Sequence, residues 1–147
     1  MTSTHTTSRG FTLVELSVVL AVALATLAVA LPGYSAQVQE SRVMPALMEL
    51  SVTGIQLEKS FQRSRQYGVG GKCAVPDAKV EHFSVHCSLS GDGRGYTLDA
   101  VGHGPMAGYR YRTDEKGRQQ TISLPQAGNA ANATLPCWSP DGRACGA

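Results

Sequence analysis

The feature that most constrains this chain is a long uncharged segment near its N-terminus. Between Glu15 and Glu40 there is no Asp, Glu, Lys or Arg, and Leu16 to Ala36 reads LSVVLAVALATLAVALPGYSA. As a helix, residues 11–34 would extend about 36 Å at about 1.5 Å per residue, enough to cross a hydrocarbon core of about 30 Å. Residues 1–10, which precede this segment, are polar, and Arg9 carries the only full charge among their side chains. We therefore expect a transmembrane helix with a cytoplasmic N-terminus.

Two ordinary explanations compete for this segment. A secretory signal peptide would use Ala28-Val29-Ala30 as its cleavage site, but its apolar part would be too long and would contain Glu15. A plain membrane anchor also leaves Glu15 unexplained, because a carboxylate in a membrane span is costly and is expected to be paired and functional. The position of Glu15 therefore favours a more specific explanation.

A motif begins just before the uncharged segment, Gly10-Phe11-Thr12-Leu13-Val14-Glu15-Leu16. It resembles the cleavage motif of type IV prepilins and pseudopilins, and residues 30–34 (ALPGY) carry the proline and tyrosine that this family often has there. The resemblance implies that a prepilin peptidase cuts between Gly10 and Phe11 and methylates the new amino group of Phe11. It also assigns Glu15 to filament assembly. One departure is Leu24, where the family often has glycine.

This role of Glu15 has a physical basis. Cutting exposes an α-amino group on Phe11 that is largely protonated at neutral pH. A lone ammonium and a lone carboxylate are both costly in lipid, so groups from neighbouring copies neutralise each other when the copies are offset along a filament. Such a pair would attract neighbouring copies to each other and would also fix the axial offset between them.

After the uncharged segment, the helical period continues but becomes amphipathic. We expect this helix to end near Tyr67-Gly68, because glycines then break the period. A second apolar edge, Met44, Met48 and Ile55, would be free to face neighbouring subunits. The main apolar stripe, expected to pack on the domain's own sheet, comprises Val43, Leu47, Leu50, Gly54, Leu57 and Phe61.

From Lys79 onward the pattern changes to strands. Residues 81–88 alternate in polarity, and residues 96–101 form a second strand pattern. Residues 109–113 and 119–124 flank Asp114-Glu115-Lys116-Gly117, which predicts a hairpin turn. We therefore expect three or four antiparallel strands packed on the amphipathic helix.

Four cysteines lie in the C-terminal half and indicate disulfides in an oxidising compartment: Cys73, Cys87, Cys137 and Cys145. Four cysteines allow three connectivities, and the sequence alone does not choose among them. We expect local pairing, Cys73 with Cys87 and Cys137 with Cys145, because each pair closes a short loop that would order the loop or the tail.

The layout is an α+β fold that resembles the type IV pilin fold. It has a cytoplasmic leader peptide (1–10), a transmembrane and assembly helix (11–38) and a periplasmic globular domain (39–147). The globular domain comprises the amphipathic half of the helix, the small antiparallel sheet and a disulfide-closed tail. The tail, with Cys137-Trp138 before Cys145, looks like the end of minor pilins.

Metal and enzyme sites are not indicated. On a strand, His82 and His86 share a face while Cys87 points the other way, and no second ligand cluster of suitable spacing exists. Residues 92–95 (DGRG) lack calcium-loop spacing. The sequence contains no recognisable phosphate loop or catalytic motif, so we expect neither an enzyme nor a cofactor.

A small basic and aromatic patch raises a DNA-binding hypothesis. The net charge of +2 is too small to indicate a nucleic-acid partner by itself. Arg110 and Arg112 share a strand face, and tyrosines 109 and 111 would add base stacking. A solvated hairpin, balanced by acidic residues in its turn, is the plainer interpretation. The possible DNA-binding residues are Arg110, Arg112, Lys116 and Arg118.

These features together favour a minor pilin. The chain would be inserted in the inner membrane, processed by the prepilin peptidase, and assembled with other pilin subunits into an extracellular filament. The alternatives are a pseudopilin of a type II secretion system and a minor pilin that captures DNA for natural competence. A processed secreted protein with no assembly role is a further, different class.

Overall fold

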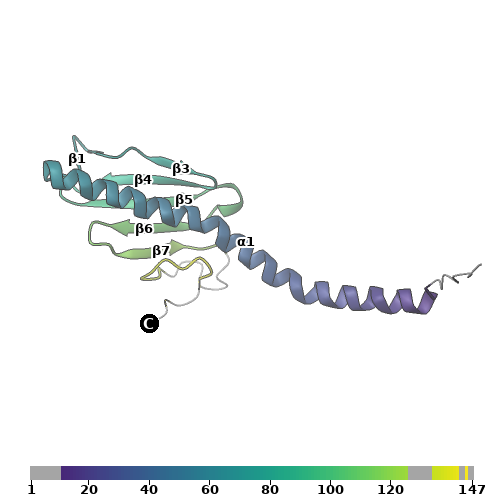
Figure 1. The fold of residues 1–147 in the computed structure, drawn as a ribbon. Helices are drawn as coiled ribbons and strands as arrows, with labels where there is room; N and C mark the ends of the chain where they lie inside the picture. The colour runs from purple at the N-terminus through teal and green to yellow at the C-terminus, as the bar shows by residue number, and fades with distance from the viewer. Residues whose placement is uncertain (1–10, 126–133, 143–144, 146–147) are drawn as a thin grey trace, which may run out of the picture. The chain divides into compact units, whose positions relative to one another are not determined.

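The computed structural model describes residues 11–125, 134–142 and 145 (Figure 1). They form two compact units, the first reaching to Ala36 and the second beginning at Gln37. Helix α1 (Leu13–Ser64) supplies the helical part of both. Within the described residues, no helical stretch is both long and apolar enough to span a membrane.

The second unit is built around a five-stranded antiparallel sheet with strand order β3-β4-β5-β6-β7. Each strand pairs with its neighbour in the sequence, so the sheet is a simple meander. A separate two-stranded hairpin, β1 (Gly68–Val69) and β2 (Lys72–Cys73), follows α1, and a short 3-10 helix η1 (Gly104–Met106) precedes β6. The strands of the sheet are β3 (Ala78–Val80), β4 (Phe83–Leu89), β5 (Tyr96–Gly102), β6 (Arg110–Asp114) and β7 (Gln119–Ser123).

The expected strands are present, and the sheet is one strand larger than expected. Strands β4 to β7 match the four segments in which polarity alternates. The additional strand, β3, pairs Val80 with Phe83 and Ala78 with Val85. With only three residues, it is too short to show a period in the sequence.

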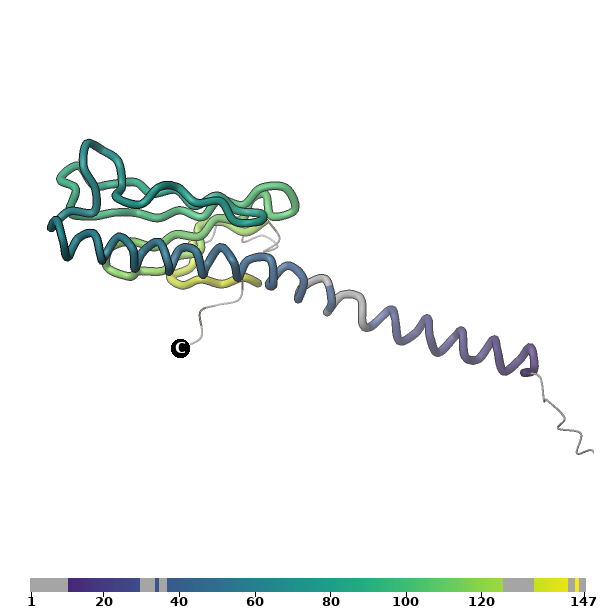
Figure 2. The backbone as a smooth tube through the Cα atoms, turned by 45° about the horizontal axis from the view of Figure 1, so that its top comes forward, coloured from purple at the N-terminus to yellow at the C-terminus, as the bar shows by residue number. Residues whose placement is uncertain are grey.

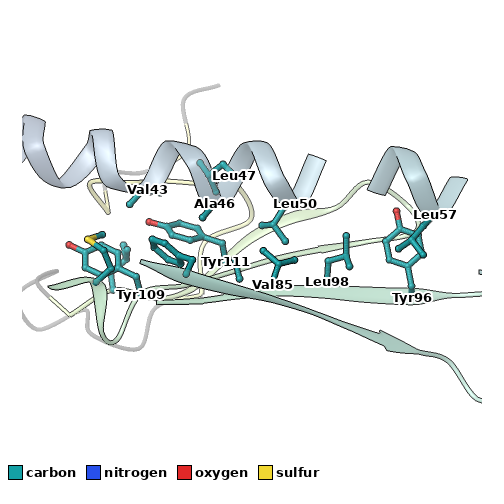
Figure 3. Close-up of a cluster of buried hydrophobic side chains, with 14 of the residues drawn as sticks. Val43, Ala46, Leu47, Leu50, Leu57, Val85, Tyr96, Leu98, Tyr109 and Tyr111 are labelled. Atoms are coloured by element: carbon teal, nitrogen blue, oxygen red, sulfur yellow. The ribbon is translucent and has the colours of Figure 1, made fainter. Parts of the chain in front are cut away.

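The core lies between the second part of α1 and the sheet. Val43, Leu50 and Leu57 of α1 are fully buried, as the amphipathic stripe predicts. They pack over Leu98 of β5 and Tyr111 of β6, which are also fully buried (Figure 3). The helix thus covers one face of the sheet (Figure 1).

The helix ends slightly earlier than expected, at Ser64 rather than near Tyr67-Gly68. Arg65 adopts a left-handed conformation with φ of 58°, and its N–H donates to the Phe61 carbonyl at 2.7 Å. A residue in this conformation is a common way to stop a helix. Tyr67 then folds back and stacks on Phe61, with ring centroids 4.6 Å apart. The chain reversal therefore buries an aromatic ring that the sequence pattern assigned to the helix end.

Both local disulfides are formed in the structure. Cys73 is bonded to Cys87, which ties the β1–β2 hairpin to β4. Cys137 is bonded to Cys145 and closes the tail. Figure 2 shows the tail running alongside the last strand, where Leu135 forms a backbone bridge with Thr121.

Candidate functional site

The first turn of α1 is organised by the same residues as the N-terminal motif. The backbone N–H of Glu15 donates to Thr12 Oγ1 at 3.3 Å, and the N–H of Leu16 donates to the Thr12 carbonyl at 3.1 Å. Thr12 is therefore the N-cap, and Glu15 is the third helical residue, where a carboxylate favours the positive end of the helix. The role of Thr12 was not predicted, although its T-x-x-E spacing carried the signal. Gly10, on the other side of the expected cleavage site, lies outside the described residues.

Beyond this cap, the first unit exposes an apolar helix surface. Phe11 is 82% exposed. The exposed large apolar residues of the helix in this unit range from 85% exposed, at Leu13, to 53% exposed, at Leu27. Because leucine and valine side chains occupy every side of the helix, its described side chains form no amphipathic packing face. A surface of this kind marks a site of contact with protein or lipid.

The second unit leaves its own apolar edge exposed on α1. Met44, Met48 and Ile55 are 47%, 65% and 56% exposed. Val52, which was not predicted to belong to this edge, joins them and is 45% exposed. The spacing of four, four and three residues places all four side chains along one side of the helix, away from the buried stripe.

The basic patch is organised by the Asp99 carboxylate, which was not predicted to belong to it. Arg110 Nε donates to Asp99 Oδ1 at 3.2 Å. Arg112 donates from Nε to Asp99 Oδ1 at 3.0 Å and from Nη2 to Oδ2 at 3.1 Å. Asp99 is only 9% exposed, and it pairs directly with Arg112 across β5 and β6. Two of the four candidate DNA contacts are therefore engaged with the sheet itself.

The rest of the patch also departs from the DNA-binding hypothesis. Arg118 donates from Nε to Asp114 Oδ2 at 2.6 Å, whereas Lys116 is exposed in the turn. Tyr109 and Tyr111 are 4% and 0% exposed. The predicted stacking by these two tyrosines is wrong, because strand alternation turns their rings into the core while the arginines face outward.

His82 and His86 make local contacts. His86 Nδ1 lies 2.7 Å from Asp77 Oδ2, and the backbone N–H of Cys87 donates to Asp77 Oδ1 at 3.1 Å. The His86 hydrogen bond, followed by that from Cys87, lowers the pKa of the Asp77 carboxyl below its ordinary value. His82 lies 3.5 Å from Glu81. In the part of the chain that the structure describes, no group of three or more His, Cys, Asp or Glu side chains is arranged to hold a metal.

The tail is held by one buried hydroxyl group. Thr121, at 0% exposed, donates from Oγ1 to the Cys137 carbonyl at 2.7 Å and accepts from the Ser139 N–H at 2.9 Å. Between these contacts, Trp138 Nε1 donates to the Arg112 carbonyl at 2.9 Å. These bonds fix the indole beside β6.

Comparisons with known proteins add one likeness. No protein-family model matches the chain, and no curated protein matches it. Among solved structures, the chain is similar to a type IV pilin from Shewanella oneidensis, at 21% sequence identity and a TM-score of 0.46. The match covers 69% of this chain and 98% of that chain.

Proposed function

We propose that this chain is a minor pilin, a structural subunit of a type IV pilus. It inserts in the inner membrane through its uncharged helix, with the globular domain in the periplasm. The prepilin peptidase cuts after Gly10 and methylates Phe11, and the mature subunit then enters the filament.

The observation that carries this proposal is the exposed apolar helix that follows the cleavage motif. This helix has no amphipathic face to bury, so it needs lipid before assembly and other subunits after it. A single carboxylate, Glu15, interrupts the apolar surface one turn from the proposed new N-terminus. A helix-bundled filament would use both parts, because neighbouring helices cover the apolar surface and an ammonium group neutralises the carboxylate.

The capped first turn supports the role of Glu15. Because Thr12 fixes the first turn, the Glu15 carboxylate is held at the helix start, within reach of the N-terminus of another copy that is offset along the axis. A carboxylate and an ammonium that leave water together stabilise each other only when they meet in good geometry. The pair would therefore select one stagger between subunits.

Intact-mass spectrometry of the membrane-extracted protein tests processing. We expect the loss of residues 1–10 and the addition of one methyl group to Phe11. A mature chain that starts at Leu31 would instead identify a secretory signal peptide and contradict the proposal.

Filament incorporation tests the role of Glu15. A Glu15→Gln variant keeps the size of the side chain and the backbone hydrogen bond to Thr12, but it loses the charge. We expect normal membrane insertion and at least a tenfold loss from sheared filaments, detected by immunoblot, since about 1.4 kcal/mol corresponds to a tenfold change. Glu40→Gln, at the other end of the uncharged segment, is the matched control and should assemble normally. Equal incorporation of the two variants would argue against the register role.

A further inference from the structure

A groove in the second unit lies between α1 and the turn that joins β6 to β7. Its volume is about 580 Å³, and Gly54, Ile55, Tyr96, Glu115 and Trp138 are among the residues that line it. Volumes of about 300–1,000 Å³ are typical of small-molecule sites. Gly54 brings the helix close to the Tyr96 hydroxyl, since a Cβ at this position would lie 3.4 Å from it, an ordinary van der Waals distance.

An unpartnered hydroxyl group faces this groove. Tyr96 is 5% exposed, and its hydroxyl makes no hydrogen bond to any residue that the structure describes. No described side-chain oxygen or nitrogen is both fully buried and unpartnered. Because the Tyr96 hydroxyl has no such partner, it is not fully buried. It lies beside Gly54, and both residues line the groove. Figure 3 shows the hydroxyl directed toward α1.

The charged groups that line the groove are mostly acidic. They are Glu58, Asp114 and Glu115, with Lys59 as the single cation among the lining residues. Arg118 neutralises Asp114, whereas neither Glu58 nor Glu115 has a cationic partner within the described residues. Burial, followed by Glu58, Asp114 and Glu115, raises the pKa of Tyr96 to about 12, which keeps its hydroxyl group protonated at neutral pH.

Aromatic groups complete the lining. The Trp138 indole is held in place by its hydrogen bond to the Arg112 carbonyl and by the disulfide on Cys137. Indole and phenol rings attract cations through their faces and also pack against alkyl chains. Carboxylates, a free hydroxyl group and a fixed indole are together suited to a positively charged group on an apolar stem.

We propose that this groove binds an organic cation, a guanidinium or ammonium group carried on an alkyl stem. The charged group lies between the Glu115 carboxylate and the Tyr96 hydroxyl, and the stem packs on Trp138 and Ile55. Such a group comes either from a basic side chain of a protein or from a free polyamine. The site is independent of the N-terminal motif and does not depend on filament formation.

The test uses the single tryptophan of the chain, Trp138, as the reporter. Emission of the full chain in non-ionic detergent is titrated with N-acetyl-arginine amide, which mimics a protein side chain, and with spermidine. N-acetyl-citrulline amide, which has the shape of the arginine probe without its charge, is the control ligand. We expect a saturable shift with the cations, weakened by added salt, and none with citrulline. The cation that binds more tightly identifies the source.

Variants locate the binding site. Glu115→Gln should weaken binding about tenfold, since a hydrogen bond to a charged group contributes about 1.5–3 kcal/mol. Tyr96→Phe should weaken it about three- to tenfold, and its hydroxyl has no internal partner whose loss would disturb the fold. Glu81→Gln, an exposed carboxylate outside the groove, should leave binding unchanged. Equal binding of citrulline and arginine, no shift with either cation, or unchanged affinity in Glu115→Gln would each overturn the proposal.

Discussion

The Thr121 hydroxyl group should contribute more to stability than its size suggests. In Thr121→Val, the side chain keeps its shape but loses one donor and one acceptor. The N–H of Ser139, a residue only 6% exposed, loses its hydrogen bond to Thr121 Oγ1, at a cost of about 1–3 kcal/mol. The lost donor to the Cys137 carbonyl adds about 0.5–1.5 kcal/mol. We expect a total destabilisation of about 2–4 kcal/mol.

Two other variants separate the hydroxyl group from packing. Thr121→Ser keeps both hydrogen bonds and loses one buried methyl group, worth about 1 kcal/mol. Thr113→Val makes the same chemical change at a residue that is 7% exposed and whose hydroxyl has no hydrogen-bond partner among the described residues. It should therefore be within about 0.5 kcal/mol of the parent protein.

Equilibrium urea unfolding of the full chain in non-ionic detergent measures these differences. Trp138 emission reports on the tail, and far-ultraviolet circular dichroism reports on the sheet and helix. If the tail detaches alone, emission changes at lower urea than circular dichroism. The reasoning fails if Thr121→Val is as stable as Thr113→Val, or more stable than Thr121→Ser.

Other predictions concern pH and close packing. The pKa of Asp77 is lowered in the folded protein, so its ionised form contributes stability above the unfolded-state pKa and loses it as pH falls through the lowered value. Asp77→Asn, which cannot form the ion pair with His86, should flatten the fall of the melting temperature below about pH 4. A Cβ at Gly102 would collide with the Met106 carbonyl, so Gly102→Ala should be destabilised by about 1–3 kcal/mol in urea unfolding. Gly91, with open space around it, is the control, and Gly91→Ala should lose no stability. Equal urea midpoints for the two variants would contradict the close packing at Gly102.

Local periodicity allowed much of the fold to be predicted. The strand over residues 81–88 was visible because Phe83 and Val85 alternate with polar neighbours, and both are buried. The buried apolar stripe of α1 could be predicted because its residues recur at spacings of three and four, the period of a helix. The β1–β2 hairpin and β3 were missed because strands of two or three residues contain too few positions to show a period.

The polar contacts of the site could not be predicted in the same way. The contact of Asp99 with Arg110 and Arg112 depends on the register between β5 and β6, which the sequence does not specify. The role of Thr121 depends on where a tail 16 residues further along the chain docks. The stacking role of the tyrosines could not be judged without the face of the sheet that is buried: Tyr109 and Tyr111 alternate with the arginines and face the core.

The two edges of the sheet are guarded, which limits the ways in which this protein can aggregate. Unpaired edge strands recruit other strands and lead to amyloid-like growth. One edge is formed by β3, which is only three residues long and has the exposed Lys79 at its centre; short strands and lysine side chains both disfavour pairing at an edge. On the other, the bridge between Thr121 and Leu135 occupies backbone groups of β7. Both features disfavour strand-to-strand growth between copies of the chain.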